Sequence, residues 1–192
     1  MGELKYFNLN NYIEKYNIEY VIETGTYRGN AIEYAIKCGV KYIYSIELIE
    51  EYYNYCCEKF KNNKNVFLFN NTSSNGLQEI FNKYNVGHCL FWLDAHLPNY
   101  YKNSFSGEYE KNKKLLIPLE DEIRIIVENK NVTNDVFIID DLRIYERGNF
   151  QSGNWNEAII TGGINFIFKM LENTHNIQRL YNDQGYVLCT PK

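Results

Sequence analysis

The chain has 192 residues, 45% of them hydrophobic and 23% charged, a composition typical of one folded globular domain. Its net charge of -4 disfavours a broad electrostatic surface for nucleic acid or anionic membrane. There is no apolar run of the roughly 18–20 residues that a membrane-spanning helix needs, and the first residues lack the pattern of a secretion signal. Five cysteines without metal-ligand spacing indicate reduced thiols, so we expect a single domain, 1–192, in the cytoplasm.

Short apolar runs alternate with amphipathic segments, which predicts alternating strands and helices. In chain order we expect a helix within 1–18, strand 20–23, helix 30–38, strand 41–47, helix 49–61, strand 65–70, helix 74–84, strand 88–94, helix 117–129, strand 135–141, a helix around 157–172, and strands near 177–181 and 185–190. Asn30 is expected to cap its helix, and Gly39 to end it. The alternation indicates a mainly parallel sheet covered by helices on both faces, and a short last turn requires antiparallel neighbours.

The segment 97–114 is polar, aromatic and interrupted by Pro98 and Gly107. Loops of this length are uncommon in compact domains and often serve as lids, so we expect a lid or a loop that binds the substrate accepting the reaction here. Its aromatic rings offer faces for stacking on a sugar or another ring, and they belong to Tyr100, Tyr101, Phe105 and Tyr109. The 18 tyrosines of the chain weaken any single one as a functional signal.

Carboxylates recur where the predicted parallel strands end, at Glu23, Glu47, Asp94 and the pair Asp140 and Asp141. In open α/β sheets ligands bind beyond the carboxyl ends of the strands. Charges next to buried strands are costly unless they are paired, bind a metal or lie at the mouth of a site. We therefore expect the chemistry at this edge of the sheet.

The spacing E-x-G-x-x-x-G, formed by Glu23, Gly25 and Gly29, resembles the first motif of class I S-adenosylmethionine-dependent methyltransferases. Glu47 matches the acid that accepts hydrogen bonds from both ribose hydroxyls in that family, a task suited to a carboxylate. The resemblance covers about residues 18–190. It implies a three-layer α/β/α Rossmann-like fold, with seven strands parallel except for the last, that binds S-adenosyl-L-methionine. The cofactor-binding residues that it implies are Glu23, Thr24, Gly25, Thr26, Gly29, Glu47, Leu48, Thr72, Ser73 and Asp94.

Two sequence features bear on the alternatives to a methyltransferase, which are a nicotinamide-dependent oxidoreductase and a non-catalytic binding protein. Tyr27 stands where the nicotinamide fingerprint G-x-G-x-x-G has its second glycine, and a side chain there would obstruct the pyrophosphate. A nicotinamide-dependent oxidoreductase is therefore disfavoured. The segment 71–73, Asn-Thr-Ser, stands where many methyltransferases have Gly-Asp-Ser, so the acid that often faces the adenine amine is missing. This departure keeps open a protein of the same fold that binds without catalysing.

Asp94, Asp140 and Asp141 resemble the metal ligands of metal-dependent O-methyltransferases of the catechol and macrolide-sugar types. The resemblance implies that they hold Mg²⁺ or another divalent cation, which would bind the acceptor hydroxyl and lower its pKa. His96 is then the expected general base beside Asp94, because an imidazole titrates near neutrality. The alternatives are that His96 is an ordinary loop histidine and that one of the paired acids caps a turn.

The segments WLDAH, PLEDEI and VFIIDDLR together resemble small methyltransferase-like proteins often associated with surface-polysaccharide genes. We therefore expect methyl transfer to a hydroxyl of a sugar, a sugar nucleotide or another small metabolite, without a nucleic-acid or membrane partner; a homodimer stays open. The acids 120–122 are expected to favour the helix dipole and to carry no chemistry. Arg143 and Arg147 are expected to be solvated or paired with nearby acids rather than to bind an anion.

Overall fold

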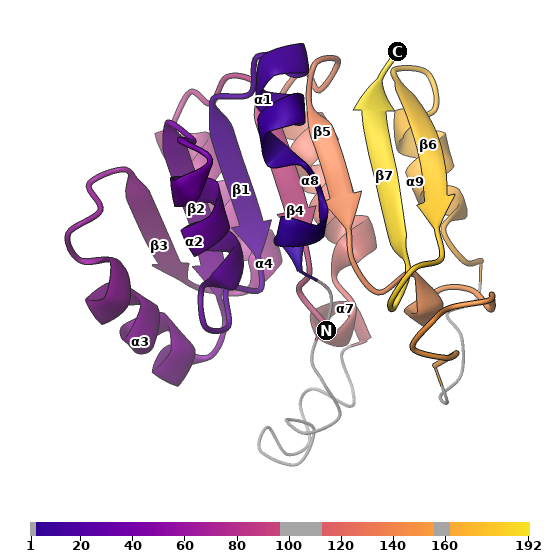
Figure 1. The fold of residues 1–192 in the computed structure, drawn as a ribbon, viewed down its shortest axis with the longest axis horizontal. Helices are drawn as coiled ribbons and strands as arrows, with labels where there is room; N and C mark the ends of the chain where they lie inside the picture. Colours follow the sequence, from indigo (N-terminus) through magenta and orange to yellow (C-terminus); the bar gives the residue numbers. More distant parts are fainter. Residues whose placement is uncertain (1–2, 97–112, 156–161) are drawn as a thin grey trace.

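A seven-stranded sheet forms the centre of the protein in a computed structural model that describes residues 3–96, 113–155 and 162–192 (Figure 1). The strand order is β3-β2-β1-β4-β5-β7-β6. Neighbours among the first five strands are parallel, and β7 is antiparallel to both β5 and β6. The strands are β1 Tyr20–Thr24, β2 Tyr42–Glu47, β3 Val66–Asn70, β4 Cys89–Leu93, β5 Val136–Ile139, β6 His175–Leu180 and β7 Tyr186–Pro191. The predicted sheet, parallel except for its last strand, is confirmed.

Helices cover both faces of this sheet (Figure 1). One face carries the 3-10 helix η1 Leu4–Tyr6 and the helices α1 Leu9–Tyr16, α2 Asn30–Lys37 and α3 Glu50–Phe60. The other face carries α4 Ser73–Lys83, α8 Leu119–Asn129 and α9 Asn165–Leu171. Two short helices lie near the edge at which β1 to β5 end, α7 Lys113–Leu116 and η2 Leu142–Ile144.

The alternation of side chains along β4 explains why the sheet is buried on both faces. All five residues of β4 are buried. Because successive side chains point to opposite faces, Leu90 and Trp92 pack beneath α1 to α3, whereas Phe91 and Leu93 pack beneath α4, α8 and α9. A central parallel strand therefore reads as one continuous apolar run, as this one does.

One predicted helix cap and one predicted helix start are wrong, and in both cases glycine is the reason. Gly29 rather than Asn30 occupies the N-cap of α2, with φ of 75°, and a Cβ there would lie 2.5 Å from the Phe60 ring. Asn30 is already helical, and its side chain donates to Glu3. The helix expected around 157–172 begins at 165, because Gly162 and Gly163 form a turn with positive φ. Residues 156–161 and the expected lid residues 97–112 lie outside the described ranges.

A buried ion pair closes the edge of the sheet opposite the strand ends. Lys130 Nζ lies 2.6 Å from Asp135 Oδ2, and Asp135 Oδ1 accepts a 2.8 Å hydrogen bond from the backbone N–H of Cys89. His175 Nε2 lies 2.9 Å from the Asp135 carbonyl oxygen. These groups satisfy one another, so this cluster is a structural tie between β4, β5 and β6.

Within the described ranges, no helix combines the length and apolar character needed to cross a membrane. All five cysteines fall in these ranges and are free thiols, as expected.

Candidate functional site

The loop that follows β1 passes close to the end of β4. Gly25 has a φ of 85°, and a Cβ at this position would lie 2.7 Å from the carbonyl oxygen of Asp94. The backbone N–H groups of Gly25 and Thr26 both donate to the carbonyl oxygen of Ile46, at 3.0 and 3.3 Å. Only glycine meets both the backbone conformation and the close approach, so the predicted glycine motif has a geometric basis.

Glu47, at the end of β2, holds this glycine loop in place. Its Oε2 accepts a 2.7 Å hydrogen bond from the backbone N–H of Tyr27, and its Oε1 accepts one of 2.8 Å from Ile49. The bond to Tyr27 accounts for the left-handed backbone of this residue, whose φ is 48°. Burial raises the pKa of Glu47, and these backbone bonds partly offset the rise. Each carboxylate oxygen keeps a second lone pair, so the acid can anchor the loop and still accept from a ligand.

Glu23 lies beneath the same loop, on the face of the sheet that carries α2 and α3. The Ser45 hydroxyl donates to Glu23 Oε2 at 2.5 Å, and Thr26 Oγ1 lies 2.5 Å from Ser45 Oγ. Burial raises the pKa of Glu23 to about 8, and the Ser45 bond partly offsets the rise. The chain of three side chains ties the loop to β1 and β2, so Glu23 positions the loop from below.

The end of β3 is used mainly to begin α4. Thr72 is the N-cap of α4, and its Oγ1 accepts a 3.2 Å hydrogen bond from the backbone N–H of Asn75. Asn71 Oδ1 accepts from the Thr72 backbone N–H at 2.9 Å. Ser73 is the first residue of α4 and is buried. The Thr72 hydroxyl therefore already has a structural partner, whereas Ser73 points toward the interior.

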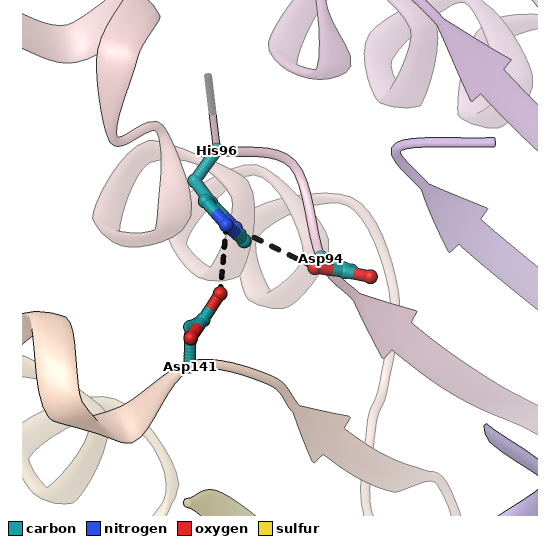
Figure 2. Close-up of side chains that lie close together, drawn as sticks. All are labelled: Asp94, His96 and Asp141. Atoms are coloured by element: carbon teal, nitrogen blue, oxygen red, sulfur yellow. Dashed lines mark ion pairs between the residues drawn. The ribbon is translucent and has the colours of Figure 1, made fainter. Parts of the chain in front are cut away.

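Asp94, His96 and Asp141 come together beyond the ends of β4 and β5 (Figure 2). His96 lies between the two acids: its Nδ1 is 3.4 Å from Asp94 Oδ1, and its Nε2 is 2.7 Å from Asp141 Oδ2. The parallel pairing of β4 with β5 explains why residues 45 positions apart in the sequence meet here. Asp141 has a left-handed φ of 57°, and Arg143 Nε lies 3.0 Å from its Oδ1.

Asp140, a predicted metal ligand, lies beside this group rather than within it. Its Oδ1 accepts a 2.8 Å hydrogen bond from the backbone N–H of Asp141, and its Oδ2 has no hydrogen-bond partner among the described residues. Burial and the negative charge of Asp141 raise the pKa of Asp140 to about 7. Burial and the neighbouring acids also raise the pKa of Asp94 well above its ordinary value. Both shifts favour the protonated acids, because the site holds more carboxyl groups than its described basic side chains can neutralise.

The two central members of the group shift each other's charge state. Burial lowers the pKa of His96, but the carboxylates of Asp141 and Asp140 outweigh this and raise the pKa above its ordinary value. Burial raises the pKa of Asp141, but His96 and Arg143 outweigh it and leave the pKa below its ordinary value. Each of the two side chains thus favours the charged form of the other.

Three ligand atoms, one from each of Asp94, His96 and Asp141, lie within 4.8 Å of one another, a spacing that suits a metal ion. Two carboxylates and an imidazole fit Mn²⁺, Fe²⁺ or Zn²⁺, while Mg²⁺ prefers oxygen ligands alone and keeps several waters. The unpartnered Asp140 Oδ2 offers a further oxygen beside the group. The donor set therefore fits a divalent cation.

Glu122 is a buried residue of this region to which the sequence assigned no chemistry. The three acids 120–122 do lie in the first turn of α8, as expected, but Glu122 is only 1% exposed. Burial raises its pKa to about 7, and the neighbouring hydroxyls of Ser73 and Thr24 partly offset the rise. The spacing of Leu119, Glu122, Ile123 and Ile126 on one helical stripe is a signal that would have indicated its burial.

The two arginines behave as expected. Arg143 pairs with Asp141 and stacks near the Trp155 ring, at 5.5 Å from its centroid, whereas Arg147 is exposed. Arg143 is therefore part of the support of Asp141.

Neither a protein-family model nor a curated protein matches the sequence. Solved structures do match it. A caffeoyl-CoA O-methyltransferase-like protein from Staphylococcus aureus matches with a TM-score of 0.57 and 11% identity over 100% of this chain and 85% of that chain. An rRNA methylase from Streptococcus thermophilus matches with a TM-score of 0.55 and 11% identity over 95% and 93%. An S-adenosylmethionine-dependent methyltransferase from Aquifex aeolicus matches with a TM-score of 0.52 and 17% identity over 98% and 92%.

These structural neighbours are class I methyltransferases, and their acceptors differ, since they include an rRNA methylase. At this level of identity the likeness concerns the path of the chain. The protein therefore has the fold of the class I S-adenosylmethionine-dependent methyltransferases.

Proposed function

We propose that the chain transfers the methyl group of S-adenosylmethionine to a hydroxyl of a small molecule, and that a divalent cation assists. The observation that carries the proposal is that the glycine loop and the Asp94–His96–Asp141 group meet at one edge of the sheet. The position of a Gly25 Cβ, 2.7 Å from the Asp94 carbonyl oxygen, joins the two features directly. The fold of the structural neighbours supports the reaction class.

The residues at this edge suit a positively charged cofactor. Six carboxylates gather there, those of Glu23, Glu47, Asp94, Glu122, Asp140 and Asp141. Among the described residues, the basic side chains placed against them are His96 and Arg143, both close to Asp141. A sulfonium cofactor and a divalent cation would each relieve part of the excess charge. In the proposal Glu47 accepts from the ribose, Leu48, Thr72 and Ser73 lie along the nucleoside, and residues 23–29 lie along the aminoacyl part.

The cation is assigned to the oxygens of Asp94 and Asp141, which flank His96. Asp140 or His96 supplies the third ligand, because Asp140 Oδ2 is unpartnered among the described residues and His96 lies between the two acids. A bound divalent cation lowers the pKa of the acceptor hydroxyl and fixes its oxygen. If Asp140 is the third ligand, His96 is free to accept the hydroxyl proton, the role that the sequence assigned to it.

The contribution of the chain to the reaction is mainly positioning. Methyl transfer is an in-line displacement, so the acceptor oxygen must lie opposite the departing thioether, and water must be excluded. The ion pair between Asp141 and Arg143 fixes the side chain that orients the imidazole. A net charge of -4 supports a small methyl acceptor rather than a nucleic acid. We assign this acceptor to the sugars and sugar nucleotides, the class that the sequence resemblance implies.

The test is transfer of a labelled methyl group to a panel of sugars and sugar nucleotides, with either EDTA, Mg²⁺ or Mn²⁺ present. Activity that requires the cation and is lost in Asp94→Asn, but is kept in the exposed control Glu120→Gln, supports the proposal. His96→Ala separates the two roles of the imidazole. If His96 is the general base, the variant loses activity but still binds Mn²⁺. If His96 is a metal ligand, the variant loses both activity and Mn²⁺ binding. Cofactor binding without any transfer would instead favour the non-catalytic alternative.

A further inference from the structure

Two buried oxygen atoms next to the glycine loop lack the partners that burial demands. Thr24 Oγ1 and Glu122 Oε1 are both inaccessible to solvent and have no hydrogen-bond partner in the described part of the chain. Thr24 is fully buried and Glu122 is 1% exposed. Buried polar atoms are almost always paired, and an unpaired carboxylate oxygen is costly. Two such atoms in neighbouring side chains indicate a place built to receive a partner.

The fold brings these atoms together on the face of the sheet that carries α4 and α8. Thr24 ends β1 and shares its face with Ile22, which packs against the core on that side. Glu122 enters from the first turn of α8, and Ser73 from the first residue of α4. The Thr24 and Ser73 hydroxyls face the Glu122 carboxylate and, by hydrogen bonding to it, hold its pKa below the value that burial alone would give. The contact between Thr24 Oγ1 and Glu122 falls short of full hydrogen-bond geometry, so Thr24 Oγ1 and Glu122 Oε1 both keep bonding capacity for a ligand. This cluster, Thr24–Ser73–Glu122, lies directly beneath the start of the glycine loop.

The chemistry of the cluster selects the kind of group that can fill it. Glu122 Oε1 only accepts hydrogen bonds when ionised, and Thr24 Oγ1 can accept as well as donate. An incoming carboxylate or phosphate would be repelled by Glu122 and by Asp94, whose charges already interact. An amino group brings two or three N–H donors and, when protonated, a compensating charge.

We propose that Thr24 and Glu122 form a subsite that binds an amino group of the cofactor, so that α8 takes part in cofactor recognition. This inference rests on the proposed function, because it takes S-adenosylmethionine as the ligand. That molecule carries two such groups, the α-amino group and the exocyclic amine of adenine. The cluster recognises the N–H donors that the two groups share, and truncated ligands distinguish between them.

The test is calorimetric titration of the full chain with S-adenosylhomocysteine at pH 8. Glu122→Met removes the acceptor at nearly the same length, and Thr24→Val removes the hydroxyl at the same shape. Both variants are expected to bind about tenfold more weakly or worse, because each loses a hydrogen bond to a ligand group. Glu120→Met, on the exposed side of the same helix turn, is the matched control and should bind as the wild type does.

Thermal unfolding of the ligand-free variants distinguishes a ligand subsite from a purely structural role. If the two side chains served only the fold, their replacement would lower the unfolding midpoint. Removing an unpartnered buried polar atom should leave the unfolding midpoint unchanged or raise it. If Glu122→Met does not fold, Thr24→Val carries the same test. A second titration with 5′-methylthioadenosine, which lacks the aminoacyl part, assigns the subsite. Weakening with both ligands indicates the adenine amine, and weakening with S-adenosylhomocysteine alone indicates the α-amino group.

Wild-type affinity in both variants would overturn the subsite while leaving the proposed function intact. A lower unfolding midpoint with unchanged affinity would likewise overturn it, because the two side chains would then serve the fold. A wild-type protein that binds neither ligand would contradict the proposed function itself, and this inference with it.

Discussion

Replacing Asp140 by asparagine should stabilise the ligand-free protein and weaken its binding of divalent cations. Asp140 Oδ1 accepts from the Asp141 backbone, which an asparagine oxygen can also do, while Oδ2 is unpartnered among the described residues. The pKa of Asp140 rises from 3.8 to about 7 in the folded state, mainly through burial and then through Asp141. Ionising this group in the folded protein at pH 8 therefore costs up to about 4 kcal/mol, and asparagine removes that cost.

The pH dependence of this gain follows from proton binding. Between pH 3.8 and about 7 the folded protein keeps a proton on Asp140 that the unfolded chain releases, so the stability of the wild type falls as the pH rises through this interval. The asparagine side chain of the variant does not titrate. The advantage of Asp140→Asn should therefore be absent below about pH 4 and complete above about pH 7.

Urea unfolding in EDTA at pH 4, 6 and 8 measures this difference, and repeating the series with Mn²⁺ measures the loss of cation stabilisation. An advantage of the same size at every pH would show that the variant improves packing rather than relieves charge. No advantage at pH 8 would refute the argument that burial and the neighbouring Asp141 make an ionised Asp140 costly without a cation.

Two further changes, one of them with a matched control, test the supports of the site, and a fourth substitution tests the opposite edge of the sheet. Gly25→Ala should lower the free energy of unfolding and abolish cofactor binding, because its Cβ meets the Asp94 carbonyl oxygen at 2.7 Å. Gly39→Ala, with φ of 74° and nothing within 4 Å, isolates the backbone strain of about 1–2 kcal/mol and should bind normally in calorimetry. Glu47→Gln should weaken S-adenosylhomocysteine binding about tenfold, and an unchanged Kd would remove its ligand role. Lys130→Met should lower the free energy of unfolding in urea by about 3–5 kcal/mol, because it leaves Asp135 without its ion-pair partner. Ligand affinity should not change, and a change would show that the edge of the sheet opposite the strand ends is coupled to the site.

The strands could be predicted because each apolar run is confined between polar turns. The run CLFWL is apolar at every position, and this pattern alone indicates a central strand, which β4 is. Helix ends were harder to predict. The first residue of α2 was predicted correctly, but its N-cap depends on the proximity of Phe60 to Gly29, which is a contact between segments 31 residues apart in the sequence.

The candidate site could be predicted only in part, because sequence identifies residue types at strand ends but not where their side chains point. The sequence singles out Asp94, His96 and Asp141, but the insertion of the imidazole between the two acids depends on the tertiary structure. Glu122 was missed because first-turn acids usually serve the helix dipole, and that rule outweighed its place on the apolar stripe of α8. A charged residue inside an apolar stripe is the more informative signal.

Titration of the purified protein with S-adenosylhomocysteine, in EDTA and with Mg²⁺ or Mn²⁺, tests the central claim most directly. We expect micromolar binding, which corresponds to about -8 kcal/mol, and further stabilisation of the folded protein by the cation. Substitutions of Glu47 or in the glycine loop should weaken that binding, and substitutions of Asp94 or Asp141 should remove the effect of the cation. Absence of binding under every condition would contradict the assignment of this edge of the sheet to S-adenosylmethionine.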